Sequence, residues 1–148
     1  QLHETLPTCD RNYPLEELLE TYGYLDGTFP ESRNDQALVL RTCHNDLNPW
    51  NVIVTEARWE TIDWEFVGNH DPLFDLITLH QGLNLPAEEL FEMCPELDPK
   101  STRTRIEVNI KNYWLREGGW AKYQIQQGNN REEIRTQLEN AQAKVDAL

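Results

Sequence analysis

Polar side chains suited to phosphate chemistry are concentrated between residues 43 and 63. His44, Asp46 and Asn51 stand in the order H-N-D-L-x-x-x-N, and a second carboxylate, Asp63, ends a short run of alternating apolar residues. Phosphoryl transfer needs one carboxylate to accept the proton of the attacking hydroxyl. It also needs an amide oxygen and a second carboxylate to hold Mg²⁺ on the nucleotide phosphates. Such oxygens are the ligands that magnesium prefers, so the ordered set indicates phosphoryl-transfer chemistry.

A β-hairpin is expected to bring these side chains together. Residues 52–54 form a β-branched run, and residues 59–64 are typical of a second short strand. An antiparallel pair returns Asp63 to the neighbourhood of Asn51, with Asp46 on the loop just before it. A hairpin that carries unrelated surface polar residues is the alternative interpretation of the same pattern.

The segment CHNDLNPWNVIV, followed by TIDWEFVGNHDPLFDL, resembles the aminoglycoside phosphotransferase and choline kinase family. This family is the small-molecule branch of the protein-kinase-like fold. The resemblance implies that Asp46 is the catalytic base and that Asn51 and Asp63 bind the metal and, through it, the nucleotide. It also implies that His44 braces the catalytic loop and that Asp75 anchors this loop from the following helix.

Differences from protein kinases predict a small acceptor. Asn45 and Asn48 stand where protein kinases have Arg and Lys, and the metal-binding triplet is D-W-E instead of D-F-G. Only residues 64–74 separate Asp63 from Asp75, which leaves no room for an activation segment with its phosphosite and peptide-docking surface. A protein substrate is therefore not expected.

The acceptor is expected to be a small alcohol that carries a positive charge. Glu65 and Asp71 suggest an acidic cleft rim, and Trp114 and Trp120 are aromatic residues suited to cation–π contact with a substrate cation. A strand-end acid and core aromatic residues are the alternative interpretations. The sequence does not choose among choline, ethanolamine, thiamine and an aminoglycoside.

Composition narrows the choice of partners and compartment. The 148 residues carry a net charge of −13, which argues against nucleic acid and anionic membranes as partners. No apolar run approaches membrane-spanning length. The three widely spaced cysteines indicate free thiols in a reducing, cytoplasmic compartment. A zinc site from Cys43, His44 and Cys94 is the alternative, but no paired spacing supports it.

The resemblance implies an α+β fold, mostly helical with a short catalytic β-hairpin. Residues 1–148 then correspond to the C-terminal lobe of a protein-kinase-like fold, and the N-terminal nucleotide lobe is expected upstream of Gln1. A helix is expected to begin at Asp71-Pro72, with Asp71 as its N-cap and Pro72 at its first position. Further helices are expected from Pro86, over residues 101–116 and 120–127 with an interruption at Gly118-Gly119, and after Asn130.

The predicted function is an ATP- and Mg²⁺-dependent kinase that phosphorylates a hydroxyl of a small molecule. This segment alone is expected to be inactive, because the Gly-rich loop and the strand lysine of such kinases are not found in it. A catalytically silent binding or scaffold module derived from a kinase is a second interpretation. An unrelated helical interaction domain is a third, and it requires the ordered motif to be accidental.

Overall fold

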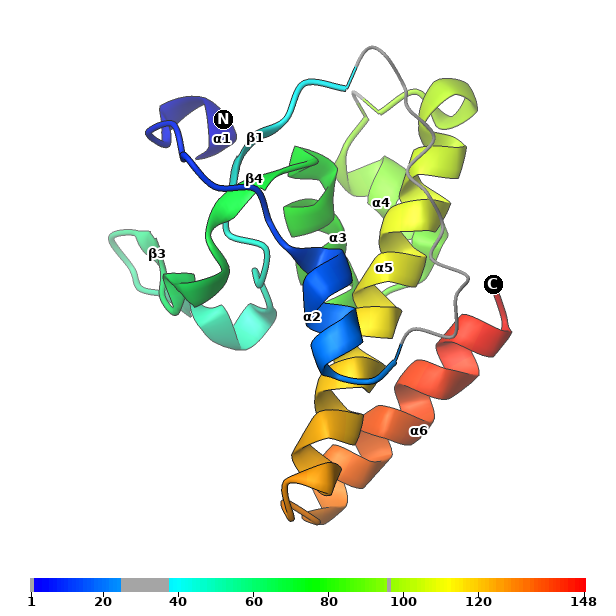
Figure 1. Ribbon diagram of the computed structural model, residues 1–148. Coiled ribbons are helices and arrows are strands. Elements are labelled where there is room, and N and C mark those ends of the chain that lie inside the picture. The colour runs from blue at the N-terminus through cyan, green and yellow to red at the C-terminus, as the bar shows by residue number, and fades with distance from the viewer. Residues whose placement is uncertain (1, 25–37, 96) are drawn as a thin grey trace. The chain divides into compact units, whose positions relative to one another are not determined.

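The computed structural model describes residues 2–24, 38–95 and 97–148 of the chain. The chain divides into two compact units, one formed by residues 1–13 and 34–106 and the other by residues 14–33 and 107–148. The helix α5 (Pro99–Gln126) begins in the first unit and continues into the second (Figure 1).

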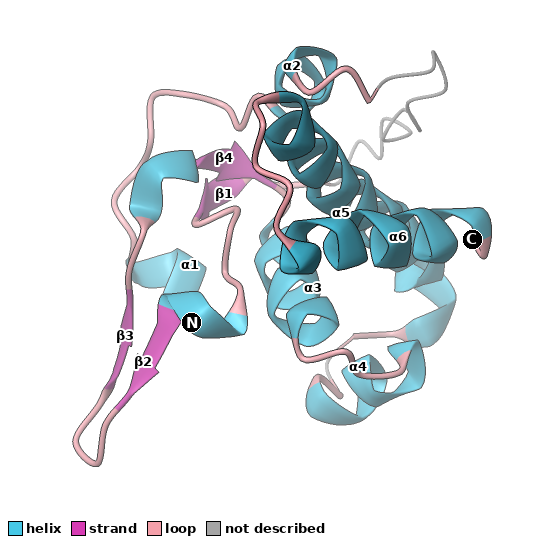
Figure 2. Ribbon diagram, turned by 90° about the horizontal axis from the view of Figure 1, so that it is seen from below, coloured by secondary structure: helices cyan, strands magenta, loops and turns pink. Residues whose placement is uncertain are grey.

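The first unit combines short helices with two small antiparallel sheets. Its elements in chain order are α1 (Leu2–Thr5), β1 (Arg41–Cys43), the 3-10 turn η1 (Pro49–Asn51), β2 (Val52–Val54), β3 (Trp59–Thr61), the 3-10 turn η2 (Trp64–Phe66), β4 (Gly68–His70), α3 (Pro72–Gly82) and α4 (Ala87–Met93). One sheet pairs β1 with β4 and the other pairs β2 with β3 (Figure 2). The predicted α+β class, mostly helical with a short hairpin, is confirmed.

The predicted hairpin is present as β2 and β3. Val52 lies opposite Thr61 in the ladder, and Val54 lies opposite Trp59. The second strand ends at Thr61 and does not continue to residue 64 as expected. The reason is that Asp63 adopts a left-handed backbone conformation with φ of 62°, which an extended strand cannot contain.

The sheet of β1 and β4 was not expected from the sequence. Its register places Cys43 opposite Gly68, and Cys43 is completely buried, as expected for a small apolar strand residue. Gly68 has little intrinsic preference for strands. It is needed because the backbone of residues 12–13 lies against it, so that a Cβ atom would come within 3.0 Å of the Tyr13 nitrogen.

The helix α3 begins as predicted at Asp71-Pro72. The Asp71 carboxylate accepts the Leu73 N–H at 2.8 Å and so caps the helix N-terminus. The buried apolar side chains of the first unit include residues from β1, the loop that follows it, α3 and α4: Cys43, Leu47, Leu73, Phe74, Ile77 and Leu90. The helix therefore forms the support against which the loop is built.

The second unit contains α2 (Leu15–Thr21), most of α5 and α6 (Glu132–Asp146). The predicted interruption at Gly118-Gly119 is wrong, because α5 continues through both glycines. A Cβ atom at residue 118 would lie 2.6 Å from the Tyr24 hydroxyl, and one at residue 119 would lie 3.1 Å from the Tyr22 ring. The glycines admit these rings, and the packing offsets their cost of about 1 kcal/mol each in a helix. None of the described helices is both long and apolar enough to cross a membrane.

Candidate active site

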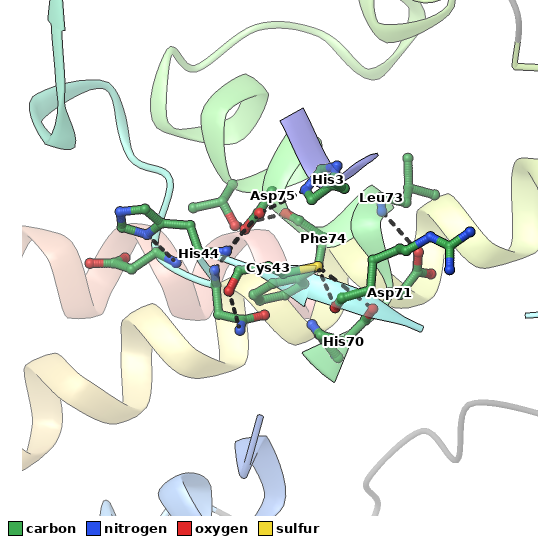
Figure 3. Close-up of polar contacts among 12 residues, drawn as sticks. His3, Cys43, His44, His70, Asp71, Leu73, Phe74 and Asp75 are labelled. Carbon is green, nitrogen blue, oxygen red and sulfur yellow. Dashed lines mark hydrogen bonds and ion pairs between the residues drawn. The ribbon is translucent and has the colours of Figure 1, made fainter. Parts of the chain in front are cut away.

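Asp75 joins the first turn of α3 to the start of the catalytic loop, residues 44–51. It is completely buried. One carboxylate oxygen accepts the His44 N–H at 2.8 Å, and the other accepts the Asn45 N–H at 2.7 Å (Figure 3). Hydrogen bonds from backbone donors to an ionised carboxylate are stronger than those between neutral groups. The helix therefore fixes the loop backbone at its first two residues.

The Asp46 carboxylate lies between two side-chain amides. Its Oδ1 atom accepts a hydrogen bond from Asn48 Nδ2 at 2.7 Å, and its Oδ2 atom accepts one from Asn51 Nδ2 at 3.0 Å. Asn48 and Asn51 are buried, whereas Asp46 is half-buried. Both carboxylate oxygens thus accept hydrogen bonds, as an ionised carboxylate does, and the side chain is oriented from both sides.

Asn51 has a side-chain orientation suited to a metal ligand. Its Nδ2 atom also donates to the Asp46 backbone carbonyl oxygen at 2.8 Å, so both hydrogen bonds of the Asn51 side-chain NH₂ group go to Asp46. The Oδ1 atom is then the atom that remains for a cation. The Asn51 carbonyl oxygen accepts the Ile62 N–H at 3.0 Å, which places exposed Asp63 one residue from that bond. A carboxylate and an amide oxygen are a donor set that fits Mg²⁺.

His44 connects the catalytic loop to the residue before Asp63. It is completely buried, and its Nδ1 atom accepts the Asp46 N–H at 3.3 Å. Its Nε2 atom lies 2.8 Å from the Ile62 carbonyl oxygen and donates to it in the tautomer that these partners require. The ring also packs against Trp64, with centroids 4.5 Å apart. His44 is therefore placed to brace the loop.

Sequence reasoning left out of the site two residues of the loop itself and one residue that packs against it. Asn48 donates to Asp46, and Asn45 contacts the segment that follows Asp63. Gly82, at the end of α3, approaches Pro49 so closely that a Cβ atom there would lie 2.4 Å from the proline ring. The sequence signalled Asn45 and Asn48 only as departures from the protein-kinase pattern, and it gave no signal for Gly82.

The expected acidic cleft rim is wrong for Asp71. That residue is buried, and both of its carboxylate oxygens accept hydrogen bonds from the Arg105 guanidinium, one of them at 2.6 Å. The Arg105 guanidinium thus neutralises the Asp71 carboxylate within the first unit. Glu65 is exposed on η2, and its backbone carbonyl oxygen accepts a hydrogen bond from Arg11 at 2.7 Å.

Trp114 and Trp120 lie on α5 in the second unit, and both are partly buried. The Trp114 ring meets Tyr113 edge-on at 4.8 Å, and the Lys144 ammonium lies 5.6 Å from its centroid. Trp114 therefore already has a cation from its own chain. A role of either tryptophan in acceptor binding stays a prediction.

A cluster of His3, Cys43 and Asp75 has its ligand atoms within 4.8 Å of one another. The carboxylate already accepts hydrogen bonds from the loop, and His3 Nε2 lies 2.9 Å from its Oδ2 atom. Burial, and next the Asp75 charge, raises the pKa of the Cys43 thiol, which disfavours the thiolate that a metal requires. The alternative zinc site at Cys43, His44 and Cys94 is not favoured either, because both ring nitrogens of His44 have hydrogen-bond partners.

Comparison with known families gives a match over most of the chain. The profile described as "Phosphotransferase enzyme family" matches residues 3–98, which include the whole catalytic loop and α3. Two proteins named LicA from Haemophilus influenzae are each 43% identical to the chain, one over 60 residues and the other over 54. These matches cover 40% and 36% of the chain, but only 17% and 20% of the relatives.

Solved structures share the fold of the chain. A choline/ethanolamine kinase family protein from Mesorhizobium loti matches with a TM-score of 0.76 and 22% identity, over 99% of this chain and 57% of that one. The choline kinase LicA from Streptococcus pneumoniae matches with a TM-score of 0.73 and 17% identity, over 99% and 59%. A LicA structure in complex with AMP matches with a TM-score of 0.71 and 18% identity, over 98% and 58%. The chain thus spans less than two thirds of each of these proteins.

Proposed function

Because the chain belongs to the phosphotransferase enzyme family, we propose that it forms the catalytic lobe of an ATP-dependent kinase that phosphorylates a hydroxyl of a small molecule. The supporting observation is the Asp46 carboxylate, which the amides of Asn48 and Asn51 hold on a buried loop. A catalytically silent descendant has no need to keep this arrangement together with Asp63. The kinase is therefore favoured over the scaffold interpretation.

Asp46 is the group that orients the acceptor hydroxyl and takes its proton during attack on the phosphorus atom. A carboxylate fixed through both oxygens loses little freedom when the substrate arrives, which lowers the entropic part of the barrier. Hydrogen bonds from Asn48 and Asn51 position it. His44 keeps the backbone of Asp46 in register with the residue before Asp63.

Asn51 Oδ1 and the Asp63 carboxylate are the residues that would hold Mg²⁺. When bound, the ion neutralises negative charge on the nucleotide phosphates. Asp63 follows the hairpin in a left-handed backbone conformation, directly after Ile62, whose N–H donates to the Asn51 carbonyl oxygen. The AMP complex of a structural neighbour supports the choice of a nucleotide as phosphoryl donor.

Choline and ethanolamine are the acceptors we place first, because the structural neighbours are described as choline and choline/ethanolamine kinases. Thiamine and aminoglycosides come second. The remaining length of those neighbours is consistent with a nucleotide lobe in addition to this one. We assign to that lobe, upstream of this chain, the phosphate-binding loop and lysine that such kinases use.

The test uses the full-length protein and measures ADP release with each of these alcohols, for the wild type and for Asp46→Asn. Asparagine keeps the size of the side chain but cannot take the proton. We expect kcat to fall by about 10² or more in the variant. Absence of ADP release by the wild type with every alcohol, or near-normal turnover by Asp46→Asn, would contradict the proposal.

A further inference from the structure

Asn45 lies between Asp75 and the segment that carries Asp63. It is completely buried, and its backbone is left-handed with φ of 65°. Asparagine tolerates this conformation better than most residues that have a Cβ atom. Its backbone N–H donates to the Asp75 carboxylate at 2.7 Å, so α3 fixes its main chain. The side-chain amide is therefore presented from a rigid support.

That amide reaches three backbone carbonyl oxygens. The Asn45 Nδ2 atom lies 3.0 Å from the oxygen of Phe66, 3.2 Å from that of Gly68 and 3.2 Å from that of Cys43. Two of these carbonyls belong to residues that follow Asp63 in the chain. Backbone carbonyls buried without a donor are costly, so these contacts favour this one path of the chain.

The same segment is bound from its other side by Arg11. The guanidinium donates to the carbonyl oxygens of Glu65 at 2.7 Å and Val67 at 2.5 Å. The four successive carbonyls of residues 65–68 thus alternate between two donors, with Phe66 and Gly68 bonded to buried Asn45. Side chains therefore bind every carbonyl of residues 65–68, in addition to the 3-10 turn of residues 64–66 and the pairing of Gly68 with β1.

We propose that Asn45 is a positioning residue that fixes residues 64–68 against the catalytic loop and so places Asp63 for metal binding. The inference rests on the proposed kinase function. Protein kinases have an arginine at this position of the H-R-D motif. Asn45 instead donates directly to backbone carbonyl oxygens of this segment.

The first test measures hydrogen exchange in the full-length protein and does not depend on activity. Asn45→Gly keeps the left-handed backbone and removes the amide. We expect residues 64–68 to exchange at least about tenfold faster in the variant, which corresponds to a loss of about 1.4 kcal/mol of local stability. The hairpin of residues 52–61 should keep its protection. Unchanged exchange at 64–68, or an equal increase in the hairpin, would overturn the proposal.

The second test separates positioning from stability. Leu90→Ala removes a buried side chain in α4 of the same unit and provides a destabilised control. For Asn45→Gly we expect the half-saturating Mg²⁺ concentration to rise by about tenfold. Loss of a residue that orients a metal ligand typically weakens metal binding by this amount or more. The KM for the acceptor alcohol should stay within about twofold. An Mg²⁺ dependence like that of Leu90→Ala would overturn the proposal.

Failure of the proposed function has a different signature. It appears as a wild-type protein that releases no ADP with any alcohol. The hydrogen-exchange comparison then still decides whether Asn45 fixes residues 64–68.

Discussion

Replacing Gly82 by alanine should disturb the catalytic loop from the last residue of α3, outside the loop itself. The new Cβ atom would lie 2.4 Å from Pro49 Cδ, 3.1 Å from Asn48 Oδ1 and 3.2 Å from Pro49 Cγ. Ordinary contact begins at 3.4 Å, so the loop and the end of α3 must separate by about 1 Å. A proline ring cannot rotate away as a long flexible side chain can.

The displacement falls on the residues that orient Asp46. The bond from Asn48 Nδ2 to Asp46 is 2.7 Å long, and lengthening by most of 1 Å takes it beyond hydrogen-bonding range. Misplacement of that size at a catalytic group costs up to about 10² in rate. We therefore expect kcat of Gly82→Ala to fall by about 10- to 100-fold. Stability should fall by about 1 kcal/mol, because overpacking exceeds the gain in helix propensity.

The assay is steady-state ADP release by the full-length protein, together with the midpoint of urea denaturation. Gly128→Ala is the matched control. It introduces the same methyl group at a positive φ of 90° with nothing within 4 Å, so it costs stability through backbone strain and leaves the loop untouched. If Gly82→Ala loses no more activity than Gly128→Ala at equal stability, the reasoning from the close contact is refuted.

Three further predictions follow from the described residues. Asp63→Ala should raise the half-saturating Mg²⁺ concentration more than Asn51→Ala does, because Asp63 carries the charge; equal effects in a metal titration would argue against this assignment. Burial lowers the pKa of His80 below its ordinary 6.5, so its contribution to stability is present above pH 6.5 and is lost as the pH falls below it. Denaturation from pH 7.5 to about 5 should show this loss, and His80→Gln should reduce it. The isolated 148-residue chain should bind Mg-ATP weakly in calorimetry, because half of the nucleotide cleft is then open to water; tight binding would contradict the two-lobe proposal.

The sequence predicted the hairpin and the capped start of α3, because each depends on local chemistry, whereas the α+β class was implied by the family resemblance. A β-branched run forms a strand, and Asp-Pro opens a helix, without information from distant residues. The sheet of β1 and β4 was missed because it has no such local cause. Gly68 and Asn69 are poor strand residues, and they pair with β1 where Asn45 and Arg11 bind the adjoining backbone.

The prediction for Gly118 and Gly119 was also wrong because their role depends on residues distant in the sequence. Gly118 and Gly119 were expected to interrupt a helix, since glycine lowers helix stability when nothing else is considered. In the structure each one admits an aromatic ring of the same unit, and α5 is continuous. Gly82 shows the same principle at the catalytic loop. The functional meaning of a glycine is set by what lies against it, which a single sequence does not display.

The charge of the acceptor illustrates where sequence reasoning ends. The expectation that the acceptor carries a positive charge rested on Glu65, Asp71 and two tryptophans. The structure does not support this expectation for Asp71 and weakens it for Trp114. Asp71 is paired with Arg105, and Trp114 faces the Lys144 ammonium. Residues that carry a charge or a π face contribute to recognition only if the protein has not already satisfied them. Glu65 is exposed two residues beyond Asp63 and remains a candidate for contact with an acceptor cation. The preference for choline or ethanolamine therefore rests on Glu65 and on the structural neighbours. Measuring the activity of Glu65→Gln with cationic and with neutral alcohols tests whether Glu65 itself supports that preference.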